Sequence, residues 1–203
     1  THCISSAASD VYKRQVISYG SNDMRVVAQL ATYNAHLGTG KKVQGRSRKD
    51  VEQSLITILK DVRKRAPNAL ILTVGYLPLV QEKHCVNLPN MTPFENTRVR
   101  HLREAADQAL TTASKTVARM SEQQWKDNGV EVVSAGISNV PFRQVHGHDL
   151  CAMGHKRFIL NREKTGVRYH YTEPGLSYIA DHVAWKYLSE QLQWSRQMVY
   201  LGR

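Results

Sequence analysis

Apolar residues recur along the chain in two alternating patterns, which predict helices separated by short buried strands. The strands are predicted at 16–19, 69–76 and 130–134, and the helices at 51–62, 92–120 and 172–188. The long helix opens on Thr92-Pro93-Phe94-Glu95, a capping box with proline in its first turn, and Gly129 ends that segment. Apolar strands separated by helices are typical of a parallel sheet covered on both faces. The pattern therefore predicts an α/β fold.

Length and composition fit one domain or most of one. The chain has 203 residues, of which 41% are hydrophobic, and no apolar run is long enough to cross a bilayer. The net charge of +11 favours anionic partners, and basic residues gather between Lys41 and Arg65. No aromatic residues are interleaved with them, so no nucleic-acid partner is expected. We interpret the cluster as a solvated rim that allows peripheral contact with anionic surfaces.

Two segments far apart in the sequence carry candidate chemistry. Gly20-Ser21-Asn22-Asp23 directly follows the first predicted strand, which places the Asn22 amide where α/β folds bind substrates. An amide donor there suits an oxyanion hole, although an Asn-Asp pair is also a common turn. His170 lies just before the last predicted helix, and imidazole is suited to general base catalysis. The alternative for His170 is a surface or packing histidine.

The first residues differ in character from the rest of the chain. Ser5 to Gln15 look like the in-frame translation of a common transposase sequencing adapter, so we expect residues 1–15 not to be native. An ordinary disordered N-terminus would share this Ser/Ala-rich composition. The adapter interpretation is favoured because the match is continuous and ends where a strand begins. The native domain is then expected over residues 16–203.

Gly20-x-Asn22-Asp23 and His170-x-x-x-x-Gly175 resemble two of the four sequence blocks of the SGNH/GDSL hydrolases. Gly75-Tyr76-Leu77-Pro78 and Gly147-His148-Asp149-Leu150-Cys151 are similar to lipase-type members, so the resemblance runs from about Val16 to Leu192. It implies a three-layer α/β/α, flavodoxin-like fold and ester hydrolysis without a cofactor. The family's nucleophile block and oxyanion-glycine block precede the Gly-x-Asn-Asp block. The resemblance therefore implies a C-terminal fragment, with the N-terminal strands missing.

Each matching residue receives a role from the resemblance. His170 is expected to be the general base and Asn22 the oxyanion donor, while Gly20 and Asp23 orient the loop. The nucleophilic serine is expected to lie outside this chain, so the fragment alone should be inactive. The substrate would be a small-molecule or lipid ester.

One departure from the family concerns the orientation of the base. Much of the family has an aspartate three residues before the histidine, whereas Val167 stands here. A backbone carbonyl, as in lipase-type members, or another acidic residue would then orient the ring; Asp181 lies too far into the last helix to be assigned. His146, His148 and His155 crowd one loop. No carboxylate completes a ligand set, so we interpret them as a polar loop and expect no metal.

Outside the N-terminal segment, which contains Cys3, the cysteines are Cys85 and Cys151. Their spacing is not that of a zinc site. Each could be a free thiol, could pair with a cysteine outside this chain, or could pair with the other. Exported family members often carry disulfides in these loops, so the resemblance favours a secreted or extracytoplasmic protein.

Two classes of function follow from these observations. The first is a carboxylic ester hydrolase, an esterase or lipase that works by serine acylation. The second is a non-enzymatic basic module that binds nucleic acid or an anionic surface through the Lys41 to Arg65 region.

Overall fold

The computed structural model describes residues 14–35, 43–80, 85, 88, 90–130, 136–142, 145, 147–152, 157–159 and 171–200. Three strands and five helices are formed by these residues. In chain order they are β1 (Arg14–Ile17), α1 (Val26–Ala35), α2 (Arg48–Arg65), β2 (Leu70–Val74), α3 (Pro93–Ala118), α4 (Glu122–Asp127), β3 (Ile137–Val140) and α5 (Glu173–Tyr200).

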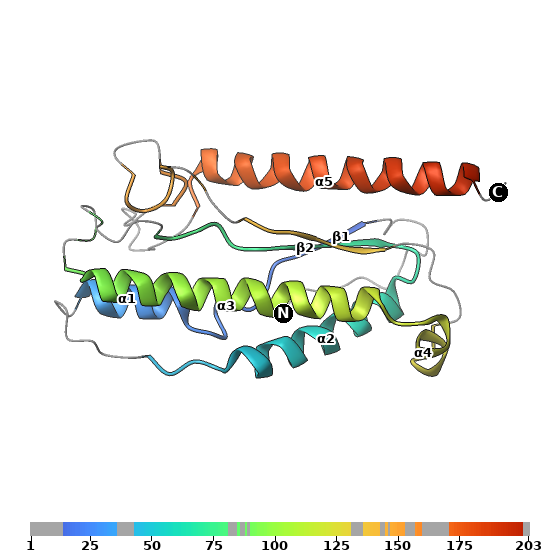
Figure 1. Cartoon of the computed structure of the whole chain (residues 1–203), viewed down its shortest axis with the longest axis horizontal. Coiled ribbons are helices and arrows are strands. Elements are labelled where there is room, and N and C mark those ends of the chain that lie inside the picture. Colours follow the sequence, from blue (N-terminus) through green and yellow to red (C-terminus); the bar gives the residue numbers. More distant parts are fainter. Residues whose placement is uncertain are drawn as a thin grey trace.

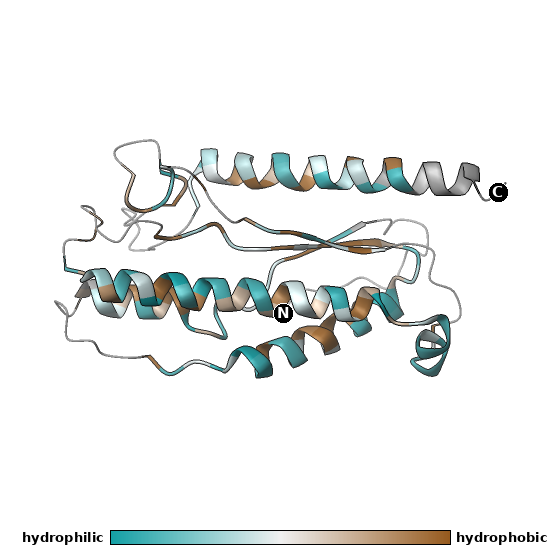
Figure 2. Ribbon diagram, in the orientation of Figure 1, coloured by the Kyte–Doolittle hydropathy of each residue, from teal (hydrophilic) through white to brown (hydrophobic). Residues whose placement is uncertain are grey.

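The three strands form a parallel sheet in the order β1-β2-β3. Figure 1 shows α1, α2 and α3 on one side of this sheet and α5 on the other. The central strand β2 is buried along its whole length, as its apolar sequence predicts. In Figure 2 hydrophobic residues are prominent along the strands where these overlap in the view, whereas α4 is mainly hydrophilic. The α/β class predicted from the sequence is thus observed.

Most predicted elements are present, with shifted ends. The capping box of α3 is confirmed, because the Thr92 side chain accepts from the Glu95 backbone while Glu95 reaches back to Thr92. The first strand begins two residues earlier than predicted, at Arg14, because parallel pairing uses backbone groups and tolerates polar side chains. Ser18 and Tyr19 have already left the strand.

The third predicted strand, 130–134, falls mostly on residues 131–135, which lie outside the described part of the chain. Val130 is described, is buried and lies outside any strand. The observed strand β3 contains Ser138 and Asn139, so the apolar run that predicts a buried strand is missing there. The short helices α1 and α4 were not predicted either.

Arg63 corrects the interpretation of the basic run as a solvated rim. Its side chain is buried, and its guanidinium donates to the carbonyl oxygens of Ala69 at 2.7 Å and Gly136 at 2.9 Å, and to Pro67 at 3.0 Å. Burial lowers the pKa of Arg63 to about 10. Arg63 therefore joins the end of α2 to the segments entering β2 and β3, and is not available to an external partner.

The last helix is less covered than its sequence predicts. Ile179 and Val183 pack against the core, but Leu176 and Leu188 of the same predicted apolar face are exposed. The sheet contacts of α5 are with β2 and β3. None of the described helices is both long enough and apolar enough to be a membrane span.

A disulfide between Cys85 and Cys151 resolves the alternatives left open for these cysteines. It links the segment after β2 to the segment after β3, with the two Cα atoms 4.7 Å apart. Beside it, the Leu150 N–H donates to the Leu79 carbonyl at 3.0 Å. The two segments are therefore tied together beyond the carboxyl ends of their strands.

Candidate active site

The carboxyl ends of the three parallel strands lie at one edge of the sheet, and the Gly20–Asp23 turn follows the first of them. Gly20 has φ of +112°, and an added Cβ would lie 3.2 Å from a methyl group of Val51 on α2. Glycine is therefore required by both its backbone conformation and its neighbour. Hydrogen bonds from the Met24 N–H to the Gly20 carbonyl and from the Val26 N–H to the Ser21 carbonyl close the turn, at 3.1 Å each, and lead into α1.

Asn22 is exposed on this turn. Its carbonyl accepts from the Arg25 N–H at 3.0 Å, and no hydrogen bond joins its side-chain amide to another described residue. Arg25 has φ of 57°, which closes the turn tightly. The amide of Asn22 thus lies at the surface of the carboxyl edge.

Asp23 faces Arg46, which follows the 36–42 gap in the described chain. The Arg46 N–H donates to the Asp23 carbonyl at 2.9 Å, and their charged groups are 3.7 Å apart. Gly45 packs directly on this turn, since an added Cβ would lie 2.7 Å from the Met24 carbonyl oxygen. The turn is held from this side by backbone contacts.

His170 lies outside the described residues, as do Val167, His146 and His155. The neighbouring residues are described: Tyr171 forms an isolated antiparallel bridge with Ile159, and the Thr172 N–H donates to the Phe158 carbonyl at 2.8 Å. Gly175 packs against the same Phe158 carbonyl so closely that an added Cβ would overlap it. This close packing explains why the last position of the His-x-x-x-x-Gly block is a glycine.

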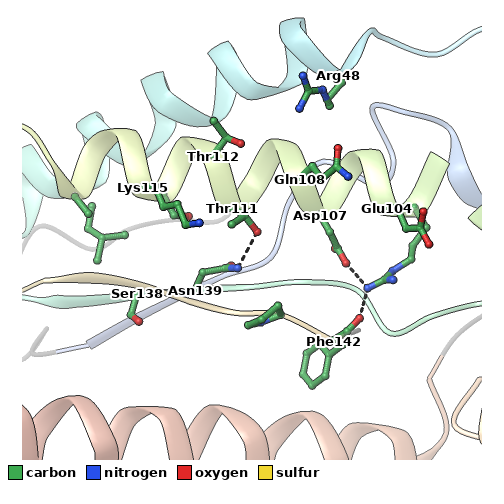
Figure 3. A pocket seen from close by; sticks show the side chains of 15 residues that line it. Arg48, Glu104, Asp107, Gln108, Thr111, Thr112, Lys115, Ser138, Asn139 and Phe142 are labelled. Carbon is green, nitrogen blue, oxygen red and sulfur yellow. Dashed lines mark hydrogen bonds and ion pairs between the residues drawn. The ribbon is translucent and has the colours of Figure 1, made fainter. Parts of the chain in front are cut away.

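A buried ion pair on α3 lies under the same edge. Arg103 pairs with Asp107 and donates to the carbonyl oxygens of Tyr76, at 3.0 Å, and of Phe142. The Tyr76 N–H in turn donates to Asp107 at 3.1 Å. Dashed lines in Figure 3 mark the contacts of this guanidinium with Asp107 and Phe142. The pair therefore connects α3 to the segments that follow β2 and β3.

Burial dominates the electrostatics of this pair. It raises the pKa of Asp107 to about 6, although the nearby Arg103 opposes the rise. It also lowers the pKa of Arg103, with Asp107 opposing. Each partner thus compensates only part of the other's desolvation, as is typical of ion pairs removed from water.

Two tyrosine hydroxyls complete the connections at this edge. The Tyr76 hydroxyl is hydrogen-bonded to the side chain of Ser18 and to the backbone of Ser21, beside Asn22, and burial raises its pKa. The Tyr171 hydroxyl is hydrogen-bonded to the backbone of Leu77, and burial raises its pKa to about 12. Both phenols therefore stay protonated at neutral pH.

A groove of about 820 Å³ is lined mainly by residues of α3 and β3. Arg48, Gln108, Thr111, Lys115 and Asn139 are among the residues that line it (Figure 3). Asn139 donates to the Thr111 hydroxyl at 2.9 Å, so the wall of the groove is itself hydrogen-bonded.

His148 and Asp181 are described residues of the sequence-predicted histidine loop and last helix. His148 stacks on Phe158 with ring centroids 4.3 Å apart, and Asp181 is exposed on α5. Among the described residues no three His, Cys, Asp or Glu side chains are grouped so as to hold a metal ion. Arg65 pairs with Asp61 at 3.0 Å on the surface of α2.

Sequence reasoning missed Arg103 and Asp107. A signal for Arg103 was present, because it continues the buried helical positions Val99, Ala106 and Leu110 on α3. A charged residue at a core position of a predicted helix requires a partner, and Asp107 is one turn away. The partners of this pair at Tyr76 and Phe142 could not be inferred from helical spacing.

Comparison with known proteins finds similar solved structures, among them a phospholipase and a lipase. Phospholipase A1 from Streptomyces albidoflavus NA297 is 15% identical with a TM-score of 0.51, over 85% of this chain and 73% of the phospholipase. The extracellular lipase from Streptomyces rimosus is 16% identical with a TM-score of 0.47, over 79% of this chain and 62% of the lipase. No family model and no curated protein matches the chain. The likeness to the phospholipase concerns the fold: the chain has a lipase-like α/β fold.

Proposed function

We propose that this chain is the C-terminal part of an SGNH-type carboxylic ester hydrolase. In this proposal Asn22 donates to the oxyanion of a tetrahedral intermediate and His170 takes the proton of a serine nucleophile that lies outside this chain. The observation that carries it is the Gly20–Asp23 turn, which presents an exposed asparagine amide at the carboxyl edge of a lipase-like parallel sheet.

The sheet supports the view that the domain has further strands. Among the described residues β1 is an edge strand, and it carries exposed apolar side chains. Val16 on β1 is 58% exposed, and Tyr19 just after the strand is 54% exposed. An edge strand with exposed apolar side chains invites pairing with another strand. The phospholipase of similar fold also has 27% of its length without a counterpart here, since the chain covers 73% of it.

Three further features fit the proposed chemistry. The disulfide favours an oxidising compartment, as expected for an exported hydrolase. Gly175 fixes the start of α5 directly after the segment that contains His170. The substrate class is proposed as a lipid or small-molecule ester, by analogy with the phospholipase of similar fold.

The decisive experiment compares the 203-residue chain with the longer protein obtained by adding the upstream genomic sequence. We expect the longer protein to hydrolyse a short-chain aryl ester, and the chain alone to be inactive. In the longer protein, Asn22→Ala should lower kcat about a hundredfold, which corresponds to about 3 kcal/mol of transition-state stabilisation. His170→Ala should abolish turnover, because the nucleophile then lacks its base.

Matched controls separate site effects from general damage. Asn128→Ala changes the same residue type at the C-terminal cap of α4, and His101→Ala changes an exposed histidine of α3. Both should retain the activity of the parent protein. Turnover by the chain alone that His170→Ala removes would contradict the proposed external nucleophile. Full activity of Asn22→Ala would refute the oxyanion role.

A further inference from the structure

Two segments at the carboxyl edge, one after β2 and one after β3, are joined through one pair of residues on α3. Arg103 binds the backbone carbonyls of Tyr76 after β2 and of Phe142 after β3, while Asp107 accepts the N–H of Tyr76. Arg103 is 5% exposed, so these bonds are shielded from water. The pair therefore fixes the position of Tyr76 through two backbone contacts, one on each side of its Cα atom.

Gly75 makes this arrangement possible. Its N–H donates to the Val140 carbonyl at 2.9 Å, which keeps it aligned with β3 just beyond the paired strands. An added Cβ would lie 3.1 Å from the Asp107 carboxylate. Glycine thus allows the carboxylate to approach the backbone that leads into Tyr76.

The side chain of Tyr76 extends this support to the Gly20–Asp23 turn. Its hydroxyl is hydrogen-bonded to the Ser18 side chain and the Ser21 backbone, which flank the entry to the turn. The backbone of the next residue, Leu77, is hydrogen-bonded to the hydroxyl of Tyr171, which follows His170 in the sequence. The Gly20–Asp23 turn and Tyr171 are therefore both attached to the dipeptide Tyr76-Leu77.

We propose that Arg103 and Asp107 are positioning residues of the candidate active site, which hold Tyr76 so that its hydroxyl fixes the turn carrying Asn22. This inference rests on the proposed function. A buried ion pair is a poor device for stability alone, because apolar residues of similar size often stabilise as well or better. Its directional bonds to the segments after β2 and β3 instead specify where those segments lie, and through Tyr76 they bear on the turn that carries the oxyanion donor.

The first test follows the Ser21 amide by hydrogen exchange in the longer protein obtained by adding the upstream genomic sequence. Tyr76→Phe removes only the hydroxyl, so exchange at Ser21 should become about tenfold faster, as expected from the loss of one hydrogen bond. Arg103→Lys and Asp107→Asn should produce the same change through Tyr76, because neither reproduces the guanidinium–carboxylate pair. Tyr33→Phe, which removes a buried hydroxyl on α1, is the control and should leave Ser21 unchanged.

The second test is kinetic and uses the longer, active protein. Tyr76→Phe should lower kcat for an aryl ester about tenfold without changing KM, because a misplaced oxyanion donor weakens only transition-state binding. Tyr33→Phe should keep the parent kcat and KM.

The outcomes distinguish this inference from the proposed function. Faster exchange at Ser21 together with a selective loss of kcat supports both. An active parent protein in which neither exchange nor kcat responds to Tyr76→Phe or Arg103→Lys overturns the positioning role and leaves the hydrolase proposal intact. If exchange at Ser21 becomes faster but no form of the protein hydrolyses esters, the proposed function is overturned. The role of Arg103 and Asp107 in catalysis is then overturned as well.

Discussion

Two arginines, residues that usually lie at the surface, are buried in the structure. Arg63 and Arg103 belong to a strongly basic chain, yet both are buried and both bind backbone carbonyls. Each arginine connects a helix to segments of the sheet with several donors from one planar group. Part of the net positive charge is therefore structural, and only the exposed remainder is available to anionic partners.

Asp107 is expected to make stability depend on pH. Its pKa is raised from 3.8 to about 6 by burial, so between these values the folded protein keeps a proton that the unfolded chain releases. Stability should therefore fall as pH rises from 4 to 6, by up to about 3 kcal/mol from this group. Urea unfolding across that pH range measures the effect. The measurement uses the 203-residue chain or the longer protein, whichever unfolds in one transition. Asp107→Asn should flatten it.

The control for this titration is Asp61→Asn, which alters an exposed carboxylate paired with Arg65 on α2. Its pH profile should follow that of the parent protein, because exposed ion pairs contribute little. Stability that instead rises with pH between 4 and 6, and loses that rise in Asp107→Asn, would mean that Arg103 outweighs burial at this carboxylate.

At the scale of elements, the start of α5 depends on one close approach. Gly175 packs on the Phe158 carbonyl, where a Cβ has no room, so Gly175→Ala should destabilise the protein by about 1 to 3 kcal/mol. This outcome is opposite to the gain that alanine normally brings to a helix. Denaturant midpoints of the parent and variant proteins measure the difference.

Gly136→Ala provides the matched glycine control. Nothing lies within 4 Å of an added Cβ there, so stability should stay unchanged or rise by up to about 1 kcal/mol. A Gly175→Ala variant as stable as Gly136→Ala would show that α5 can shift away from Phe158 without cost.

At the scale of the whole molecule, the exposed apolar surface is expected to govern behaviour in solution. Large apolar side chains are exposed on β1, just after β1 and on α5; among them are Val16, Tyr19, Leu176, Trp185, Leu188 and Leu192. Such surface on an edge strand and a helix favours aggregation. We therefore expect the chain alone to be insoluble or molten, with a broad thermal transition and dye binding. Addition of the upstream sequence should restore one sharp transition.

A sharp, cooperative unfolding transition from a soluble monomer of the 203-residue chain would contradict this expectation. It would show that the described sheet is sufficient by itself, and that the exposed apolar residues need no further strand to cover them.

The sequence by itself determined the elements whose signals are local. The apolar run of β2, the helical spacing of α2 and the capping box of α3 depend only on neighbouring residues, so their presence and approximate ends could be predicted. The place of Asn22 at the end of a strand was equally readable. The strand β3 was not, because an edge strand with Ser138 and Asn139 lacks an apolar pattern.

Only the tertiary structure decided which segments meet. Cys85 pairs with Cys151 across 66 residues, and Arg103 reaches the backbone of both Tyr76 and Phe142. The directions of these contacts are set by how the three parallel strands are aligned and how α3 lies across them. Local sequence patterns do not reveal this alignment, because every residue has the same backbone carbonyl and any of them could accept the hydrogen bond. For this reason the support of the candidate site became visible only in three dimensions.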